Sequence, residues 1–225
     1  MFKHLCILLF TSLAVNVPGY GQDYFRIKAD ISVKISNTDG TKSLTRATVY
    51  YDKNIKELIY DIYFPQEEKW ISKDTSLFKY NKDSLIQRIT IPPLNEFTVF
   101  HLALNTGLND YGLRKTNYSL SKVEKKGDMV LSYWKIPEQL NLPIDHVVIA
   151  KKDSRLESVI MVGEDQEILS KQFFRNYIKM DAFEFPGQII QITYDSMGKE
   201  NYQVTEFSNV KVNDLANTQL YHFKQ

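Results

Sequence analysis

An unbroken alternation of apolar and polar side chains over Phe25 to Ile35 is the feature that most restricts the fold. Apolar residues take every second position from Phe25, and the positions between them are Arg26, Lys28, Asp30, Ser32 and Lys34. Successive side chains of a strand point to opposite faces, so this period of two predicts a strand with one buried and one solvated face. The turn signal at Asn37 to Gly40 and the alternating stretch Ser43 to Asp52 then predict an antiparallel hairpin.

The rest of the chain repeats this pattern of short strands and turns. Further strands are predicted at Glu57–Phe64, Lys69–Ser72, Thr75–Tyr80, Ser84–Ile91, Ser119–Glu124, Met129–Ile136, His146–Lys151, Leu156–Val162, Glu167–Met180, Gln188–Tyr194 and Tyr202–Val212. About a dozen strands are more than a flat sheet holds without curling. The fold class expected is therefore mainly β with a few helices (α+β), built on a strongly curved antiparallel sheet.

One segment, Pro93 to Gly107, has helical spacing instead. Phe97, Phe100 and Leu104 recur there at intervals of three and four. Proline suits the first turn of a helix and glycine its end, so a helix over the whole segment is predicted. We expect it to pack against a face of the sheet.

Residues 1–22 have the layout of a cleaved secretory signal peptide. A basic head at Lys3 and His4 precedes an apolar run from Leu5 to Val15 and a small, turn-prone tail. The run is about eleven residues long, whereas a membrane span needs roughly twenty. The single cysteine, Cys6, is removed with this peptide. We therefore expect an exported chain, residues 23–225, without disulfide, cysteine metal site, lipid anchor or stable membrane insertion.

Composition limits the remaining classes of function. The chain has 28 basic and 27 acidic residues, interspersed along its length. This balance gives no electrostatic case for binding nucleic acid or an anionic membrane surface. Roughly 200 residues without a linker or an internal repeat suit one domain with a substantial core.

The sequence offers no set of residues for catalysis, metal or cofactor binding. His101, His146 and His222 stand in no metal-ligand spacing, and His101 is interpreted as a partly buried, hydrogen-bonded side chain. Nucleophile and phosphate-loop motifs are missing. The acidic pairs Glu67-Glu68 and Glu164-Asp165 lie in turns and are interpreted as solvated surface charge. The protein is therefore not expected to be an enzyme.

Apolar surface is what remains to carry a function. A concave sheet face lidded by a helix can enclose a ligand pocket. The candidate pocket residues are Phe25, Ile27, Leu58, Tyr60, Ile62, Phe64, Phe97, Phe100, Leu104 and Trp134. The same side chains can instead fill a solid core, and patterning does not separate a cavity from a packed interior.

The order of motifs along the chain resembles a known family. The early motifs are Phe25 to Ile35, Thr41 to Val49, Tyr50-Tyr51-Asp52-Lys53, Leu58 to Phe64 with Pro65, and Trp70 to Tyr80. The late motifs are Phe173 to Tyr177, Phe185-Pro186-Gly187 to Tyr194, Met197-Gly198-Lys199 and Val210 to Asn213. In this order they resemble the LolA/LolB superfamily, and specifically the LolA-like outer-membrane lipoprotein-sorting proteins.

That resemblance implies an incomplete β-barrel, covered by at least one helix, whose concave face takes up acyl chains. It implies a soluble periplasmic protein that binds lipid or lipoprotein acyl chains and acts as a chaperone in lipoprotein transport to the outer membrane. No cofactor is implied. An alternative on the same scaffold is an RseB-like envelope sensor or interaction module with other envelope proteins as partners. A small outer-membrane barrel fits the strand count but lacks clear aromatic girdles.

Overall fold

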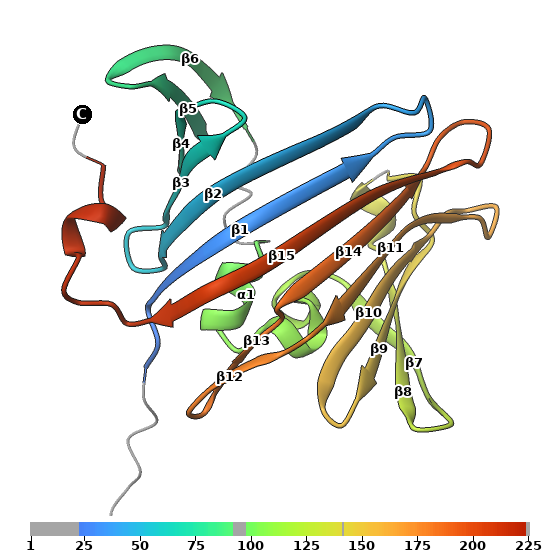
Figure 1. The fold of residues 1–225 in the computed structure, drawn as a ribbon. Helices are drawn as coiled ribbons and strands as arrows, with labels where there is room; N and C mark the ends of the chain where they lie inside the picture. Colours follow the sequence, from blue (N-terminus) through green and yellow to red (C-terminus); the bar gives the residue numbers. More distant parts are fainter. Residues whose placement is uncertain (1–22, 92–97, 141, 224–225) are drawn as a thin grey trace, which may run out of the picture.

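A single long antiparallel sheet dominates the structure, a computed structural model that describes residues 23–91, 98–140 and 142–223 (Figure 1). The predicted signal peptide lies outside these residues, as do residues 92–97 at the start of the predicted helix. The strands of the sheet are β1 (Arg26–Ser36), β2 (Lys42–Asp52), β3 (Glu57–Phe64), β4 (Glu68–Lys73), β5 (Ser76–Asn81), β6 (Ser84–Thr90), β7 (Ser119–Lys126), β8 (Met129–Lys135), β9 (His146–Lys152), β10 (Arg155–Val162), β11 (Ile168–Arg175), β14 (Gln188–Tyr194) and β15 (Glu200–Val212). The prediction of a mainly β fold with few helices is confirmed.

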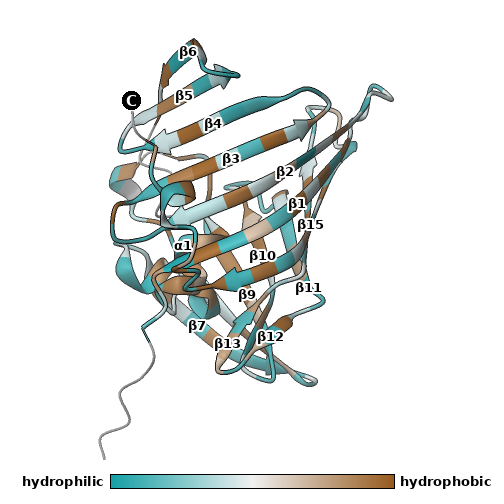
Figure 2. Ribbon diagram, turned by 60° about the vertical axis from the view of Figure 1, so that its left-hand side comes forward, coloured by the Kyte–Doolittle hydropathy of each residue, from teal (hydrophilic) through white to brown (hydrophobic). Residues whose placement is uncertain are grey.

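Alternating side chains give β1 its two faces, as the sequence predicts. Ile27, Ala29 and Ile31 are buried, while the residues between them are only partly so. Burying one isoleucine side chain contributes about 1.5–3 kcal/mol. A slip of the pairing by one residue would turn these side chains outward, so their burial fixes the register. Figure 2 shows the same alternation of hydrophobic and hydrophilic segments along the neighbouring strands.

The strand order consists of two meanders joined by the last strands of the chain. It runs β6-β5-β4-β3-β2-β1-β15-β14-β11-β10-β9-β8-β7. The join is the antiparallel pair of β1 and β15, in which Ile31 lies opposite Phe207. Among the described residues, β6 and β7 have no further strand beside them, so the sheet is not closed.

The segment between β6 and β7 crosses from one end of the sheet to the other. It contains α1 (Val99–Leu104), η2 (Leu108–Asp110) and η3 (Leu113–Lys115). Figure 1 shows α1 on the inner side of the bend in the sheet, which we call the concave face. Two further short helices, η4 (Glu138–Leu140) and η5 (Thr218–Tyr221), lie elsewhere in the chain.

The predicted helix over Pro93 to Gly107 is too long at its C-terminal end. Thr98 is the N-cap of α1, and its hydroxyl accepts a hydrogen bond from the backbone N–H of His101 at 3.2 Å. The helix ends at Leu104, and Thr106 has a left-handed φ of 55° that no α-helix accommodates. Gly107 therefore lies in the turn after the helix.

The predicted strand Glu167–Met180 is in fact two strands. Asn176 has a left-handed φ of 55°, and β11 ends just before it at Arg175. Beyond this turn, β12 (Ile178–Met180) pairs with β13 (Phe183–Phe185) in a separate two-stranded sheet. This hairpin was not predicted.

Buried residues cover both faces of the sheet near the end of β2. On the concave face, Tyr51 belongs to a cluster that includes Phe100 of α1 and Phe185 of β13. On the opposite face, Tyr50 belongs to a smaller cluster with Tyr221 of η5. The C-terminal segment thus packs on one face of β2 to β4, and residues of α1 pack on the other face beside Tyr51.

Glu57 anchors this C-terminal segment, so Glu57→Ala is expected to release it. The carboxylate has no solvent exposure, and it accepts the backbone N–H of Phe223 at 2.6 Å. Its second oxygen lies 3.2 Å from Nδ1 of His222 and 3.6 Å from Nζ of Lys73. Because charged hydrogen bonds contribute about 1.5–3 kcal/mol, we expect a loss of about 2 kcal/mol in unfolding free energy and faster carboxypeptidase trimming.

Glu164→Ala is the matched control, since this glutamate is exposed in a turn. It should change the unfolding free energy by less than about 0.5 kcal/mol. Equal trimming rates for the two variants would show that Glu57 does not hold the segment.

Candidate functional site: an uncharged cavity beside α1

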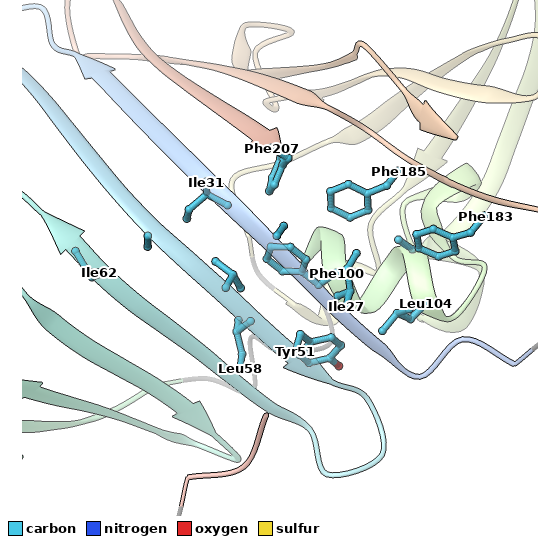
Figure 3. Packing of buried hydrophobic residues seen from close by; sticks show 14 residues of the cluster. Ile27, Ile31, Tyr51, Leu58, Ile62, Phe100, Leu104, Phe183, Phe185 and Phe207 are labelled. Atoms are coloured by element: carbon cyan, nitrogen blue, oxygen red, sulfur yellow. The ribbon is translucent and has the colours of Figure 1, made fainter. Parts of the chain in front are cut away.

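The short helix α1 is held in place by apolar packing and by polar contacts. Four of its six residues are buried, among them Phe100 and Leu104. Phe100 stacks on Phe185 at a centroid distance of 5.8 Å and meets Phe207 edge-on at 5.8 Å, and Figure 3 labels these three rings. The Tyr51 hydroxyl lies 2.7 Å from Nδ1 of His101, which confirms the interpretation of that histidine.

A cavity of about 410 Å³ lies between α1, η2 and the concave face of the sheet. Its floor comes from β1, β3, β11, β14 and β15. Of these, β1, β15, β14 and β11 are consecutive in the sheet, and β3 is separated from β1 by β2. The described lining residues are Ile31, Val33, Tyr60, Thr98, Val99, Phe100, Leu102, Leu108, Tyr111, Gln172, Phe174, Ile189, Gln191, Gln203, Thr205 and Phe207. None of these side chains is charged.

Two tyrosines in the lining, Tyr60 and Tyr111, have phenol groups whose pKa is raised by burial. Burial raises the pKa of Tyr60 to about 12. Burial also raises the pKa of Tyr111, and the hydrogen bond that its hydroxyl donates to Oε1 of Gln172 at 2.8 Å opposes this in part. Both phenols are therefore neutral at physiological pH, and the cavity keeps its uncharged character.

A second cavity, of about 460 Å³, lies beside Leu104 and the β12–β13 hairpin. Its lining carries charges, including Asp23, Asp153 and the pair formed by Arg155 and Glu184. In that pair the guanidinium donates two hydrogen bonds to the carboxylate, at 2.8 and 2.6 Å. This larger space suits an apolar ligand less well than the uncharged cavity, which we take as the candidate site.

The structure brings most of the predicted pocket residues into one cluster. Ile27, Leu58, Ile62, Phe100 and Leu104 are buried together, and Tyr60 packs against them. Of these six, Tyr60 and Phe100 line the uncharged cavity, whereas Leu104 lines the charged one.

The remaining predicted pocket residues lie elsewhere. Trp134 belongs to a separate buried cluster with Phe174. Phe25 lies beneath the guanidinium of Arg26, 5.3 Å from ring centroid to carbon. Phe64 is 43% exposed at the end of β3. Phe97 lies outside the described residues.

Sequence reasoning missed the lining residues from the C-terminal half of the chain. Phe174, Ile189, Gln191, Gln203 and Thr205 all lie on strands that were predicted, but not on faces that were assigned. Strand alternation is the signal that could have found them. Once one residue of a strand is known to face the concave side, every second residue of that strand faces it too.

The described residues contain no group of three or more His, Cys, Asp and Glu side chains placed to hold a metal ion. No helix within residues 23–91, 98–140 and 142–223 is long and apolar enough to cross a membrane.

Comparison with known proteins places the fold. No protein-family profile matches the sequence, and no curated protein matches it. Among solved structures, a LolA superfamily protein from Nitrosomonas europaea is similar with a TM-score of 0.60 and 16% identity over 89% of this chain and 91% of that one. A DUF1329 family protein from Desulfovibrio piger gives a TM-score of 0.61 and 12% identity, covering 88% and 90%.

A third solved structure carries a functional description. It is a putative outer membrane lipoprotein-sorting protein domain from Vibrio parahaemolyticus, similar with a TM-score of 0.59 and 12% identity over 88% of this chain and 91% of that one. At such low sequence identity, the similarity shows a shared fold and nothing more. In all three comparisons it extends over nearly the whole chain. The chain therefore has the fold of LolA superfamily proteins, as the resemblance in its sequence predicts.

Proposed function

We propose that this protein binds the acyl chains of lipids or lipoproteins in the uncharged cavity, and that it works in the periplasm in lipoprotein sorting or transport to the outer membrane. The observation that carries the proposal is the cavity of about 410 Å³ between α1 and the concave face. Its volume falls within the roughly 300–1,000 Å³ of small-molecule pockets. In this proposal the sheet acts as an incomplete β-barrel and α1 is its cover.

The chemistry of the lining supports an acyl ligand. Phe100, Phe174, Ile189 and Phe207 offer apolar surface, and no described lining residue is charged. Each methylene transferred from water to such surface contributes about 0.8 kcal/mol, so a long chain binds without a specific polar contact. The likeness to a lipoprotein-sorting domain supports the role, and the predicted signal peptide supports the compartment. The role proposed is a non-catalytic one without a cofactor.

Lipid analysis of the purified protein tests the proposal. The chain is produced with its own residues 1–22 in a Gram-negative host, purified from the periplasmic extract without detergent, denatured and extracted for mass spectrometry. We expect acyl lipid or lipidated peptide in near-stoichiometric amount. Repeated absence of lipid, together with failure to take up a fluorescent acyl probe, would sink the proposal.

Thr205→Phe is expected to block the cavity and reduce bound lipid by about fivefold or more, because a closely packed interior has no room for both ring and ligand. Thr205 lines the cavity from β15. The control is Val204→Phe, one residue earlier on the same strand and on the opposite face, where Val204 lies opposite Lys34 of β1. Equal lipid content in the two variants would place the ligand elsewhere.

The sensor or interaction module is the second candidate, and the edge strands favour it. Leu85 and Ile86 on β6 are more than half exposed, and Val123 on β7 is too. Unpaired edge strands offer backbone groups to which another chain can add a strand. Pull-down from envelope extract, with the original chain and with Ile86→Lys, distinguishes the two candidate functions. A stable partner protein that binds the original chain but not the variant, together with no bound lipid, favours the sensor.

A further inference from the structure

We infer that the uncharged cavity selects acyl ligands whose head group is neutral and hydrogen-bonding, such as an ester, amide or hydroxyl, over those with a carboxylate, phosphate or ammonium. This rests on the proposed function, since it specifies the ligand class of the same site. The feature that carries it is a row of three glutamines, Gln172, Gln191 and Gln203, on the concave face.

Strand register places the three amides side by side. Gln172 of β11 lies opposite Gln191 of β14, and Gln191 lies opposite Gln203 of β15. Residues directly opposite on antiparallel strands have Cβ atoms about 4.5–5.5 Å apart. All three line the cavity, so they form one continuous polar band across three strands.

The next row of the same face is mostly apolar. On each of the three strands, the residue of this row is two positions from the glutamine. Phe174 lies opposite Ile189, and Ile189 lies opposite Thr205. Beyond this row, Phe207 of β15 lies opposite Ile31 and contacts Phe100 of α1. The cavity is therefore amphipathic along the strand direction, with apolar surface beside α1 and amides on the side away from it.

The amides have hydrogen-bonding capacity that the described residues leave unused. Gln172 accepts one hydrogen bond from the Tyr111 hydroxyl. The side chains of Gln191 and Gln203, both partly buried, form no hydrogen bond with the described residues. A carboxamide offers two N–H donors and one carbonyl acceptor, so it can pair with an ester or amide carbonyl and with a hydroxyl.

Within the part of the chain that the structure describes, a charged head group would find no counter-ion at this band. The described lining has no charged side chain, and the cations of β11 belong to the other face, where Lys171 lies over Tyr194 and Arg175 over Phe173. Moving an ionised group out of water without a partner costs far more than moving a neutral one that keeps its hydrogen bonds. The band therefore favours neutral head groups by discriminating against charged ones.

Competition with a neutral fluorescent probe, N-phenyl-1-naphthylamine, tests the inference. The competitors share one dodecyl chain: a monoacylglycerol, the fatty acid, the alkyl phosphate and the alkyltrimethylammonium, each below its micelle concentration. We expect the monoacylglycerol to displace the probe at about tenfold lower concentration than the three charged ligands. An N-acylated cysteine peptide with amide-capped, uncharged ends is a further arm, and its rank against the monoacylglycerol distinguishes lipoprotein from glyceride as the source.

Gln191→Leu and Gln203→Leu are expected to remove most of this selectivity while keeping the affinity for the chain. Gln188→Leu is the control, because Gln188 is on β14 but on the opposite face from Gln191. Gln191→Glu should reverse the preference toward the ammonium ligand. Having two leucine variants keeps the test decisive if one of them fails to fold.

The outcomes separate the inference from the proposed function. If no ligand displaces the probe and no lipid is recovered from the protein, acyl binding itself is wrong, and the inference falls with it. Equal displacement by all four ligands, or selectivity unchanged in both leucine variants, overturns the inference and leaves acyl binding standing.

Discussion

Phe185→Ala is expected to lower the free energy of unfolding by about 3–5 kcal/mol, the range for removing a large aromatic side chain from a core. Phe185 has no solvent exposure and contacts three other rings: Phe100, Phe183 and Phe207, at centroid distances of 5.8, 6.5 and 5.1 Å. The loss should be large because β13 belongs to a two-stranded sheet, which is marginal without such packing. Urea titration followed by tryptophan fluorescence measures it.

Phe64→Ala is the control for this prediction. Phe64 is the same residue type but 43% exposed at the end of β3. Its truncation should cost less than about 1 kcal/mol, since little buried area is lost. Comparable destabilisation by the two variants would contradict the prediction that packing around Phe185 stabilises the core beside α1.

Asp52→Ala is expected to lower the free energy of unfolding by about 3 kcal/mol, near the lower end for breaking a buried ion pair. Its carboxylate accepts a hydrogen bond from Nε of Arg26 at 2.6 Å, and the two side chains are only 3% and 13% exposed. It also accepts the backbone N–H of Asn54 at 2.9 Å. Removing it leaves the guanidinium enclosed without its counter-ion.

The same guanidinium connects the sheet to the C-terminal segment, so the effect should reach η5. Arg26 donates a hydrogen bond to Oγ1 of Thr218 at 3.0 Å and lies 5.0 Å from the ring centroid of Tyr221. Hydrogen exchange near residues 218–223 should increase in Asp52→Ala.

Glu206→Ala provides the exposed counterpart. Its pair with Lys34 has a similar distance, 2.9 Å, but the side chains are 44% and 57% exposed. Solvent-exposed pairs contribute about 0–1 kcal/mol, so this variant should stay within that range. A cost for Asp52→Ala no larger than for Glu206→Ala would contradict the role assigned to the buried pair.

The strands could be predicted because their signals are local. The predicted bounds Glu57–Phe64 and Gln188–Tyr194 agree with β3 and β14, where turn residues flank the strands. The break at Asn176 could not be predicted, because it depends on a distant partner: the Asn176 carbonyl accepts the N–H of Gly187 at 3.1 Å. The early end of α1 similarly depends on packing rather than on propensity.

The candidate site was harder to predict than the fold. Tyr60 and Phe100 line the cavity, and both are candidates from the sequence because of the periodicity of their own elements. Trp134 lies in a separate buried cluster, and nothing in its own strand says which part of the sheet β8 joins. Gln191 carries no local signal at all, and only the register with its neighbours gives it a role.

The place of β15 in the sheet also has a consequence for how the chain acquires its structure. β1 pairs with β15, and the side-chain oxygen of Asn213 accepts the backbone N–H of Phe25 across 188 residues. The two meanders therefore cannot pair with each other until the chain has been synthesised through β15. Loop closure over such a separation is slow, and edges left open meanwhile invite aggregation. A chain with this topology benefits from being kept unfolded until its C-terminal strand is available.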